Sequence, residues 1–337
     1  LIAAVALGYE VGARVGTAAS LRGSMHPHGT WGAICAATAV ARLAGATAPA
    51  MRTTFNIASN LGLGTSRRTM LEGATVRNAF AGISGQMGIV CAHMVDAGFS
   101  GERDGIAHVF GKVLSDSFDA EAMTDELGSR WEVLRNYFKM HSCCRYNHAA
   151  LDALHQIMAG SGDGPRPDDI AAIHVDTYAL AVELDDPSPQ NTLAAKFSLP
   201  FAIATTLFHR DSGVASFRWE AVRNPAIGEL ARKVALREDK GMSARLPHQR
   251  PARVRIVLHD GKVLEAETAT NRGDWADPYA PEEIREKFMS LTSQLWSEEG
   301  SVAVYDAIMN LEGIADIGDL TRLMKRATRT NQSRSRI

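Results

Sequence analysis

Three short stretches of the chain concentrate side chains that can bind anions or move protons. The first is the segment 26–31, which reads His-Pro-His-Gly-Thr-Trp and precedes a run of small and apolar residues. The second is 75–80, which holds Arg77 among small and apolar neighbours. The third is 139–148, which contains a lysine, an arginine, two histidines and two cysteines. Imidazole, guanidinium and amine groups together suit a small, negatively charged ligand.

Each stretch has a functional and a plainer interpretation. If a helix follows His26, the backbone N–H groups of its first turn face this loop and favour an anion, but a loop histidine can also satisfy local backbone groups. Arg77 is costly to bury unless it is paired or faces a cleft, and it can instead hold its guanidinium in solvent. Lys139 can transfer a proton if burial or a cationic neighbour lowers its pKa, and its segment can otherwise be a polar hinge.

The third stretch supports a substrate site better than a metal site. Its position at a predicted domain junction favours ligand binding there, and we expect Arg145 and His148 to contribute to it. We also expect His148, Asp152 and His155 to share one face of a helix. The spacing of the cysteines and histidines matches no standard zinc module, so we predict no metal site. Walker A, dinucleotide-binding and nucleophile-elbow motifs are absent from the sequence.

Hydrophobic periodicity predicts mostly helices, with strands confined to the middle of the chain. Alternation predicts a strand over 170–178, and the Asp260-Gly261 turn between 253–258 and 263–270 predicts a β-hairpin. The predicted helices cover 2–15, 31–43, 48–61, 74–97, 149–158, 197–208, 225–235, 282–296, 302–311 and 320–327.

This order predicts a mainly α fold with an α+β insertion. The 337 residues correspond to about two domains. We expect a large all-helical domain over 1–135 and 277–337, interrupted by a smaller α+β lid domain over 136–276. Because the sequence does not begin with Met and opens inside a predicted helix, we expect the helical domain to lack its N-terminal helices here.

Charge and composition exclude several classes of protein. Lys plus Arg total 36 and Asp plus Glu total 38, so the net charge of −2 predicts no general attraction to nucleic acid or to a membrane surface. We find no apolar run of the roughly 20 residues that a membrane span needs. Four cysteines, two of them adjacent, do not form a disulfide framework. We therefore expect a cytoplasmic protein.

The same stretches resemble motifs of the MmgE/PrpD superfamily, which includes 2-methylcitrate dehydratase, cis-aconitate decarboxylase and iminodisuccinate epimerase. The similarity extends over nearly the whole chain, in matching order. Its motifs are Gly8-Tyr9-Glu10 with Arg14, His26-Pro27 with Trp31-Gly32-Ala33, Arg77 to Gly82 with Gly98-Phe99-Ser100-Gly101, Lys139 to His148 with Asp152, and Lys196-Phe197-Ser198 with Pro200.

The resemblance implies a homodimer with a large helical domain and a lid, acting on a small polycarboxylate without a metal or organic cofactor. It implies a lyase, first a 2-methylcitrate dehydratase-like enzyme. Decarboxylation or epimerisation of a related acid, or polyanion binding without catalysis, are the alternatives.

The resemblance also implies roles for individual residues. Lys139 and His26 would be catalytic, and cationic side chains would pair with the substrate carboxylates. Arg77, Arg145, His148 and Ser198 would bind substrate. Arg77 stands where many members have lysine; it can bind a carboxylate through two hydrogen bonds but carries protons poorly at neutral pH.

Overall fold

A computed structural model describes residues 1–160 and 164–327. The chain is mainly helical with small sheets, in agreement with the predicted class. It divides into two compact units: Leu1–Asn136 with His141–Asn271, and Tyr137–Met140 with Arg272–Ile337. The chain thus crosses between units near 136–141 and 271–272.

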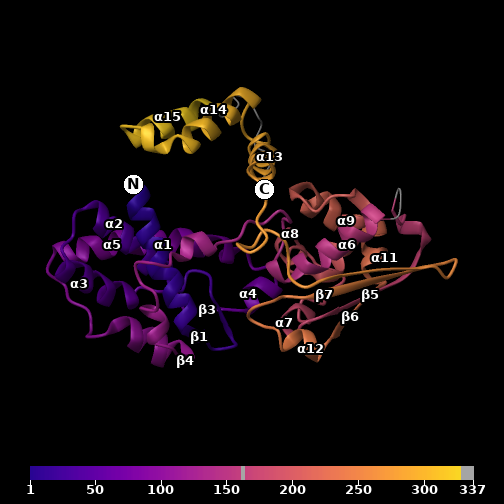
Figure 1. Cartoon of the computed structure of the whole chain (residues 1–337), viewed down its shortest axis with the longest axis horizontal. Helices are drawn as coiled ribbons and strands as arrows, with labels where there is room; N and C mark the ends of the chain where they lie inside the picture. Colours follow the sequence, from indigo (N-terminus) through magenta and orange to yellow (C-terminus); the bar gives the residue numbers. More distant parts are fainter. Residues whose placement is uncertain (161–163, 328–337) are drawn as a thin grey trace. The chain divides into compact units, whose positions relative to one another are not determined.

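Closely packed helices form the N-terminal part of the first unit, where α2 lies against α1, α3 and α5 (Figure 1). Small residues permit this approach: a Cβ at Gly8 would lie 2.6 Å from the carbonyl oxygen of Cys35, and one at Gly88 would lie 2.4 Å from the Ala36 Cβ. The helices are α1 Ile2–Ala18, α2 Gly32–Leu43, α3 Ala48–Ser59 and α5 Phe80–Asp96.

Short elements join these helices, and most of them were not predicted. A strand of two to four residues carries too little pattern to be recognised without its partner. The antiparallel pairs are β1 Ala19–Leu21 with β4 Ser115–Phe118, and β2 Met25–His26 with β3 Thr65–Ser66. The helical turns are α4 Arg68–Leu71, the 3₁₀ turn η1 Thr75–Ala79 and the π-helix η2 Ile106–Val113.

The C-terminal part of the first unit contains a four-stranded sheet in the order β6-β5-β7-β8. The predicted hairpin is confirmed by β7 Ala252–Leu258 and β8 Val263–Thr268, which pair antiparallel. The predicted strand is β5 Ile170–Thr177. The predicted helix over 225–235 is wrong at its end, because α11 Pro225–Ala231 stops and β6 Val234–Glu238 pairs parallel to β5.

Helices α6 His148–Gly160 and α9 Leu199–His209 contact this sheet and share its core, as Figure 1 shows. The predicted helix over 197–208 begins two residues later, because the Ser198 hydroxyl accepts a hydrogen bond of 3.0 Å from the Phe201 N–H and caps α9. The remaining short helices are α7 Ala179–Val182, α8 Thr192–Ala195, α10 Trp219–Val222 and α12 Lys240–Ser243.

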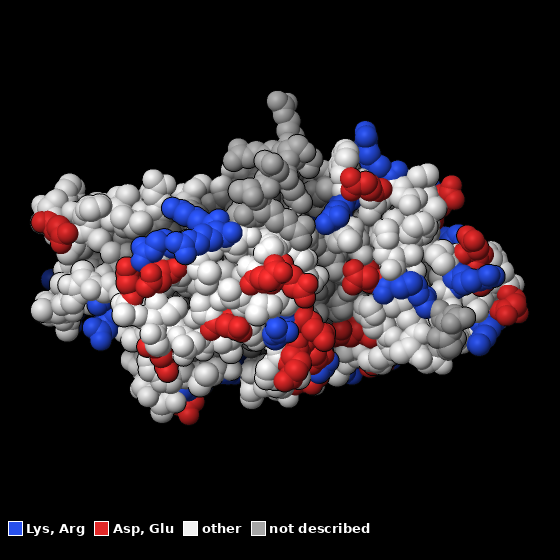
Figure 2. Space-filling model, turned by 90° about the horizontal axis from the view of Figure 1, so that it is seen from above, with Lys and Arg blue, Asp and Glu red and all other residues white. Residues whose placement is uncertain are grey.

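The second unit contains three helices in its described residues: α13 Pro281–Thr292, α14 Glu298–Met309 and α15 Ile317–Ala327. Within residues 1–160 and 164–327, we find no helix that is long and apolar enough to cross a membrane. On the face drawn in Figure 2, Lys and Arg side chains lie in small groups beside Asp and Glu.

Candidate functional site

Backbone hydrogen bonds fix His26 at the end of β2. The His26 carbonyl accepts hydrogen bonds from the hydroxyls of Thr65 at 3.0 Å and Thr30 at 3.2 Å. Its ring Nδ1 accepts the backbone N–H of His28 at 2.9 Å. Because Nδ1 is an acceptor, Nε2 carries the proton of the neutral ring.

His26 is neutral at pH 7, which corrects the expectation that it contributes a positive charge. Its side chain is buried, and burial together with His28, Arg77 and Arg67 lowers its pKa to about 4. Desolvation and nearby cations both disfavour the imidazolium. His26 therefore offers a neutral N–H donor.

Arg77 lies beside this ring, on η1. One guanidinium nitrogen is 3.3 Å from the Nε2 of His28, and the guanidinium carbon lies 5.1 Å from the centre of the Phe197 ring. Its Nε is buried and has no hydrogen-bond partner in the described part of the chain, where we also find no carboxylate paired with Arg77. Burial lowers the pKa of Arg77, but an arginine stays charged at neutral pH.

Arg67 adds a second positive charge, and Glu183 neutralises it at 2.6 Å. We call the group of His26, His28, Arg67, Arg77 and Phe197 the His26–Arg77 cluster. Four of its members come from segments before residue 78 and Phe197 comes from the segment before α9, so tertiary contacts assemble it. Its net charge is positive, and Arg77 has hydrogen-bonding capacity to spare.

His141 lies at the centre of a separate polar network that includes three residues of α6. Its Nε2 lies 2.9 Å from an Asp152 oxygen, and its Nδ1 lies 2.6 Å from the Ser212 hydroxyl. Its ring meets the edge of His148 at 4.9 Å and stacks on His155 at 5.6 Å. The predicted shared face of His148, Asp152 and His155 is confirmed, since all three contact one imidazole.

Hydrogen bonds hold the other three predicted binding residues, whose role toward a substrate stays a prediction. His148 is buried, with Nε2 3.3 Å from the Cys143 carbonyl oxygen. Arg145 is half-buried and its Nε lies 3.5 Å from the Asn271 side chain. Ser198 is fully buried; its hydroxyl donates to the Asp186 carbonyl while it caps α9. The structure brings together His26 and Arg77.

Lys139 belongs to the second unit, in the exposed part of the segment Tyr137–Met140. The backbone N–H of Phe138 donates to the Gly273 carbonyl at 3.0 Å, which ties this segment to its unit. Burial and the like charge of Lys139 lower the pKa of Lys287 on α13. Two amines thus lie near each other in this unit.

Sequence reasoning missed three members of the cluster. His28 belongs to the quoted motif but was not chosen, although two histidines beside one proline could have indicated both. Phe197 also belongs to a quoted motif, Lys196-Phe197-Ser198, whereas Arg67 carries no local signal because only tertiary contacts place it here. In the described residues we find no group of three or more His, Cys, Asp or Glu side chains that could hold a metal ion.

Two family models match this chain, one over its helical part and one over its α+β part. The chain matches the MmgE/PrpD N-terminal domain over residues 1–122 and the MmgE/PrpD C-terminal domain over residues 141–311. The chain belongs to the MmgE/PrpD family.

Its curated relatives include cis-aconitate decarboxylases. It is 23% identical to the cis-aconitate decarboxylase-like protein oryM of Aspergillus oryzae and 21% identical to the cis-aconitate decarboxylase of Aspergillus terreus; each match covers 96% of this chain and 70% of the relative. It is 25% identical to the cis-aconitate decarboxylase of Mus musculus over 46% of this chain and 32% of that protein.

Proposed function

We propose that this protein is a lyase for a small di- or tricarboxylate, which binds at the His26–Arg77 cluster. The observation that carries the proposal is Arg77: a half-buried guanidinium with no carboxylate partner in the described residues and a buried Nε with no acceptor. A buried, unsatisfied donor on a cation is costly unless a ligand pairs with it. A substrate carboxylate would meet that need.

The geometry assigns different tasks to the two residues. Arg77 would hold a carboxylate through two parallel N–H···O bonds, with its plane fixed by the Phe197 ring. His26 would donate a hydrogen bond from its Nε2–H to an oxygen on which negative charge develops during the reaction. A neutral donor held rigidly in a buried site stabilises such charge without reorganising.

A proton donor or acceptor must come from elsewhere, and we propose Lys139 for that task. The like charge of Lys139 and burial lower the pKa of the neighbouring Lys287, so the two amines interact electrostatically. The proposal requires the lid arrangement and closure that the family resemblance implies, and a homodimer is part of it. Light scattering of the purified protein tests the dimer: a monomeric mass at micromolar concentration would contradict it.

Decarboxylation is the better supported reaction, because the relatives that align over 96% of this chain are named as cis-aconitate decarboxylases or decarboxylase-like. Dehydration of a 2-methylcitrate-like hydroxy acid rests on the family resemblance alone. Both reactions need recognition of two or three carboxylates.

The test is product analysis by proton NMR with cis-aconitate, 2-methylcitrate and iminodisuccinate as separate substrates. We expect loss of one carboxylate from cis-aconitate, and expect Arg77→Gln and Lys139→Gln to lose activity. Arg52→Gln, at an exposed arginine on α3, is the matched control. If the protein turns over none of the three acids but is thermally stabilised by them, it is a polyanion-binding protein and not a lyase. Full activity of both variants would refute the site.

A further inference from the structure

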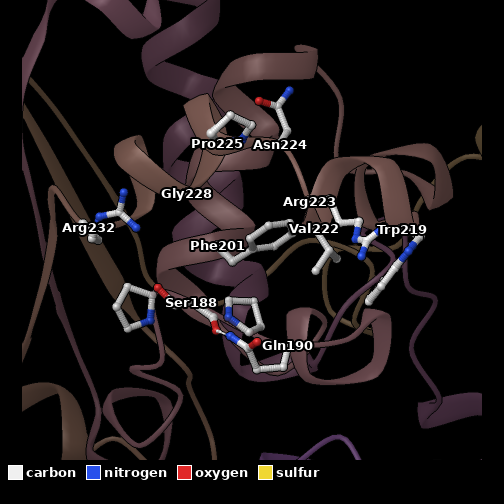
Figure 3. Close-up of a pocket in the computed structure, with 12 residues that line it drawn as sticks. Ser188, Gln190, Phe201, Trp219, Val222, Arg223, Asn224, Pro225, Gly228 and Arg232 are labelled. Atoms are coloured by element: carbon white, nitrogen blue, oxygen red, sulfur yellow. Dashed lines mark hydrogen bonds between the residues drawn. The ribbon is translucent and has the colours of Figure 1, made fainter.

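A second pocket lies within the α+β part of the first unit, away from the residues of the His26–Arg77 cluster. It has a volume of about 380 Å³, which is within the usual range for small-molecule sites. Three segments form its walls: the Pro187–Gln190 loop, α10 with the residues that follow it, and α11 to Arg232. Figure 3 shows Phe201 of α9 in the middle of the pocket.

The charge of this pocket is entirely positive. Two arginines line it, Arg223 and Arg232, and its lining contains no Asp or Glu. In the described residues neither arginine has an ion-pair partner. In the view of Figure 3 the two arginines lie on opposite sides of Phe201. An anion that enters the pocket therefore meets two cations and no competing carboxylate in its lining.

Aromatic rings and prolines form much of the rest of the pocket, beside the polar side chains of Ser188, Gln190 and Asn224. Phe201 is buried and packs against Phe217 with ring centres 6.2 Å apart. The Arg223 guanidinium carbon lies 4.9 Å from the centre of the half-exposed Trp219 ring, which holds that cation in place. Three prolines, 187, 189 and 225, restrict the backbone of the walls. A preformed pocket loses little entropy when it binds a ligand.

We propose that this pocket binds a small organic carboxylate with a flat apolar body. The body would lie against Phe201 and Trp219, and the carboxylate would pair with Arg223 or Arg232. The proposal does not depend on the lyase activity, since the two sites share no residue.

The experiment uses 1-naphthoate as the probe, with isothermal titration calorimetry on the full chain. We expect saturable binding that weakens at least fivefold in Arg223→Gln and in Arg232→Gln and further in the double variant. Arg52→Gln is the matched control and should bind as the parent does. The uncharged 1-naphthamide and inorganic phosphate should each bind at least tenfold more weakly, because each lacks one half of the ligand.

Several results would overturn the proposal. Absence of naphthoate binding at millimolar concentration would do so, as would equal binding by the arginine variants. Equal binding of naphthamide would mean an apolar pocket without anion recognition, and equal binding of phosphate would mean an anion site without an apolar one. Arg223→Lys keeps the positive charge but not the planar guanidinium beside the Trp219 ring. If the glutamine variants lose secondary structure by circular dichroism, a folded Arg223→Lys must still bind 1-naphthoate more weakly than the parent does.

Discussion

Replacing Arg77 with methionine should leave the protein as stable as before, or more stable, while it removes carboxylate binding. The buried Nε without an acceptor costs about 1–3 kcal/mol, which the substitution recovers. The lost contact with Phe197 was worth about 0.5–2 kcal/mol, and the methionine thioether regains part of it on the same ring. The net change in unfolding free energy is a gain of about 0–2 kcal/mol.

The same substitution should weaken the binding of a carboxylate. A carboxylate held by two charge-assisted hydrogen bonds gains about 1.5–3 kcal/mol from each. Losing both weakens the affinity by at least about 100-fold, at 1.36 kcal/mol for each tenfold. Arg77→Lys keeps the charge but not the planar fork, so its affinity should lie between those of the parent and Arg77→Met.

The assay measures both quantities on the same samples. Urea unfolding gives stability, and calorimetric titration with propane-1,2,3-tricarboxylate gives affinity. Arg68→Met is the control, because Arg68 is exposed and paired with Glu72, a surface pair worth about 0.5 kcal/mol or less. The reasoning is refuted if Arg77→Met binds within threefold of the parent, or if it loses more than about 2 kcal/mol of stability, since Arg77 would then serve the fold.

Three further predictions concern buried ionisable groups. Glu10→Gln should lower the free energy of unfolding in urea by about 3–5 kcal/mol, because Arg14 is buried against Glu10 at 2.6 Å. Glu72→Gln is the exposed control, and an equal loss of stability in both variants would contradict this prediction. His141→Ala should cost about 2–4 kcal/mol, because it leaves Asp152 and Ser212 without their shared partner, whereas His209→Ala on the surface should cost almost nothing. The folded-state pKa of His26 is about 4, below its unfolded value of about 6.5, so its contribution to stability is present above pH 6.5 and is lost as pH falls towards 4. His26→Asn should therefore reduce the loss of unfolding free energy between pH 7 and pH 4.5 by roughly 1–3 kcal/mol, and an unchanged pH slope would show that His26 titrates normally.

Local pattern predicted the long elements well, because their residues are adjacent in sequence. The Asp260-Gly261 turn determined the hairpin, and Gly261 indeed takes a left-handed φ of +85°. Local pattern failed to predict strands whose pairing partner is distant in sequence. β2 exists because Thr65 lies opposite His26, and β6 exists because it pairs with β5. No periodicity in 225–235 could reveal the second pairing.

The same distinction applies to the site. Residue type and a helix-entry loop made His26 and Arg77 candidates, the resemblance implied their roles, and the structure brings the two residues together. Ser198 was selected through the motif, but its hydroxyl is used by the fold, as a cap for α9 and a donor to the Asp186 carbonyl. Whether His26 is charged could not be read from the sequence, because burial and Arg77 lower its pKa and both are tertiary effects.

The protonation states in the His26–Arg77 cluster bear on the choice between reactions. Dehydration needs a base to remove a proton from carbon and an acid to protonate the leaving hydroxyl, whereas decarboxylation breaks a C–C bond, releases CO₂ and needs one proton for the carbon that keeps the electron pair. Arg77 does not release its proton, and Nδ1 of His26 already accepts a backbone N–H, so neither residue is a base. A cluster that binds and stabilises charge, with one proton donor brought to it, is sufficient for decarboxylation. If the protein decarboxylates in D₂O, one deuterium must enter the product, at the carbon that takes up the electron pair.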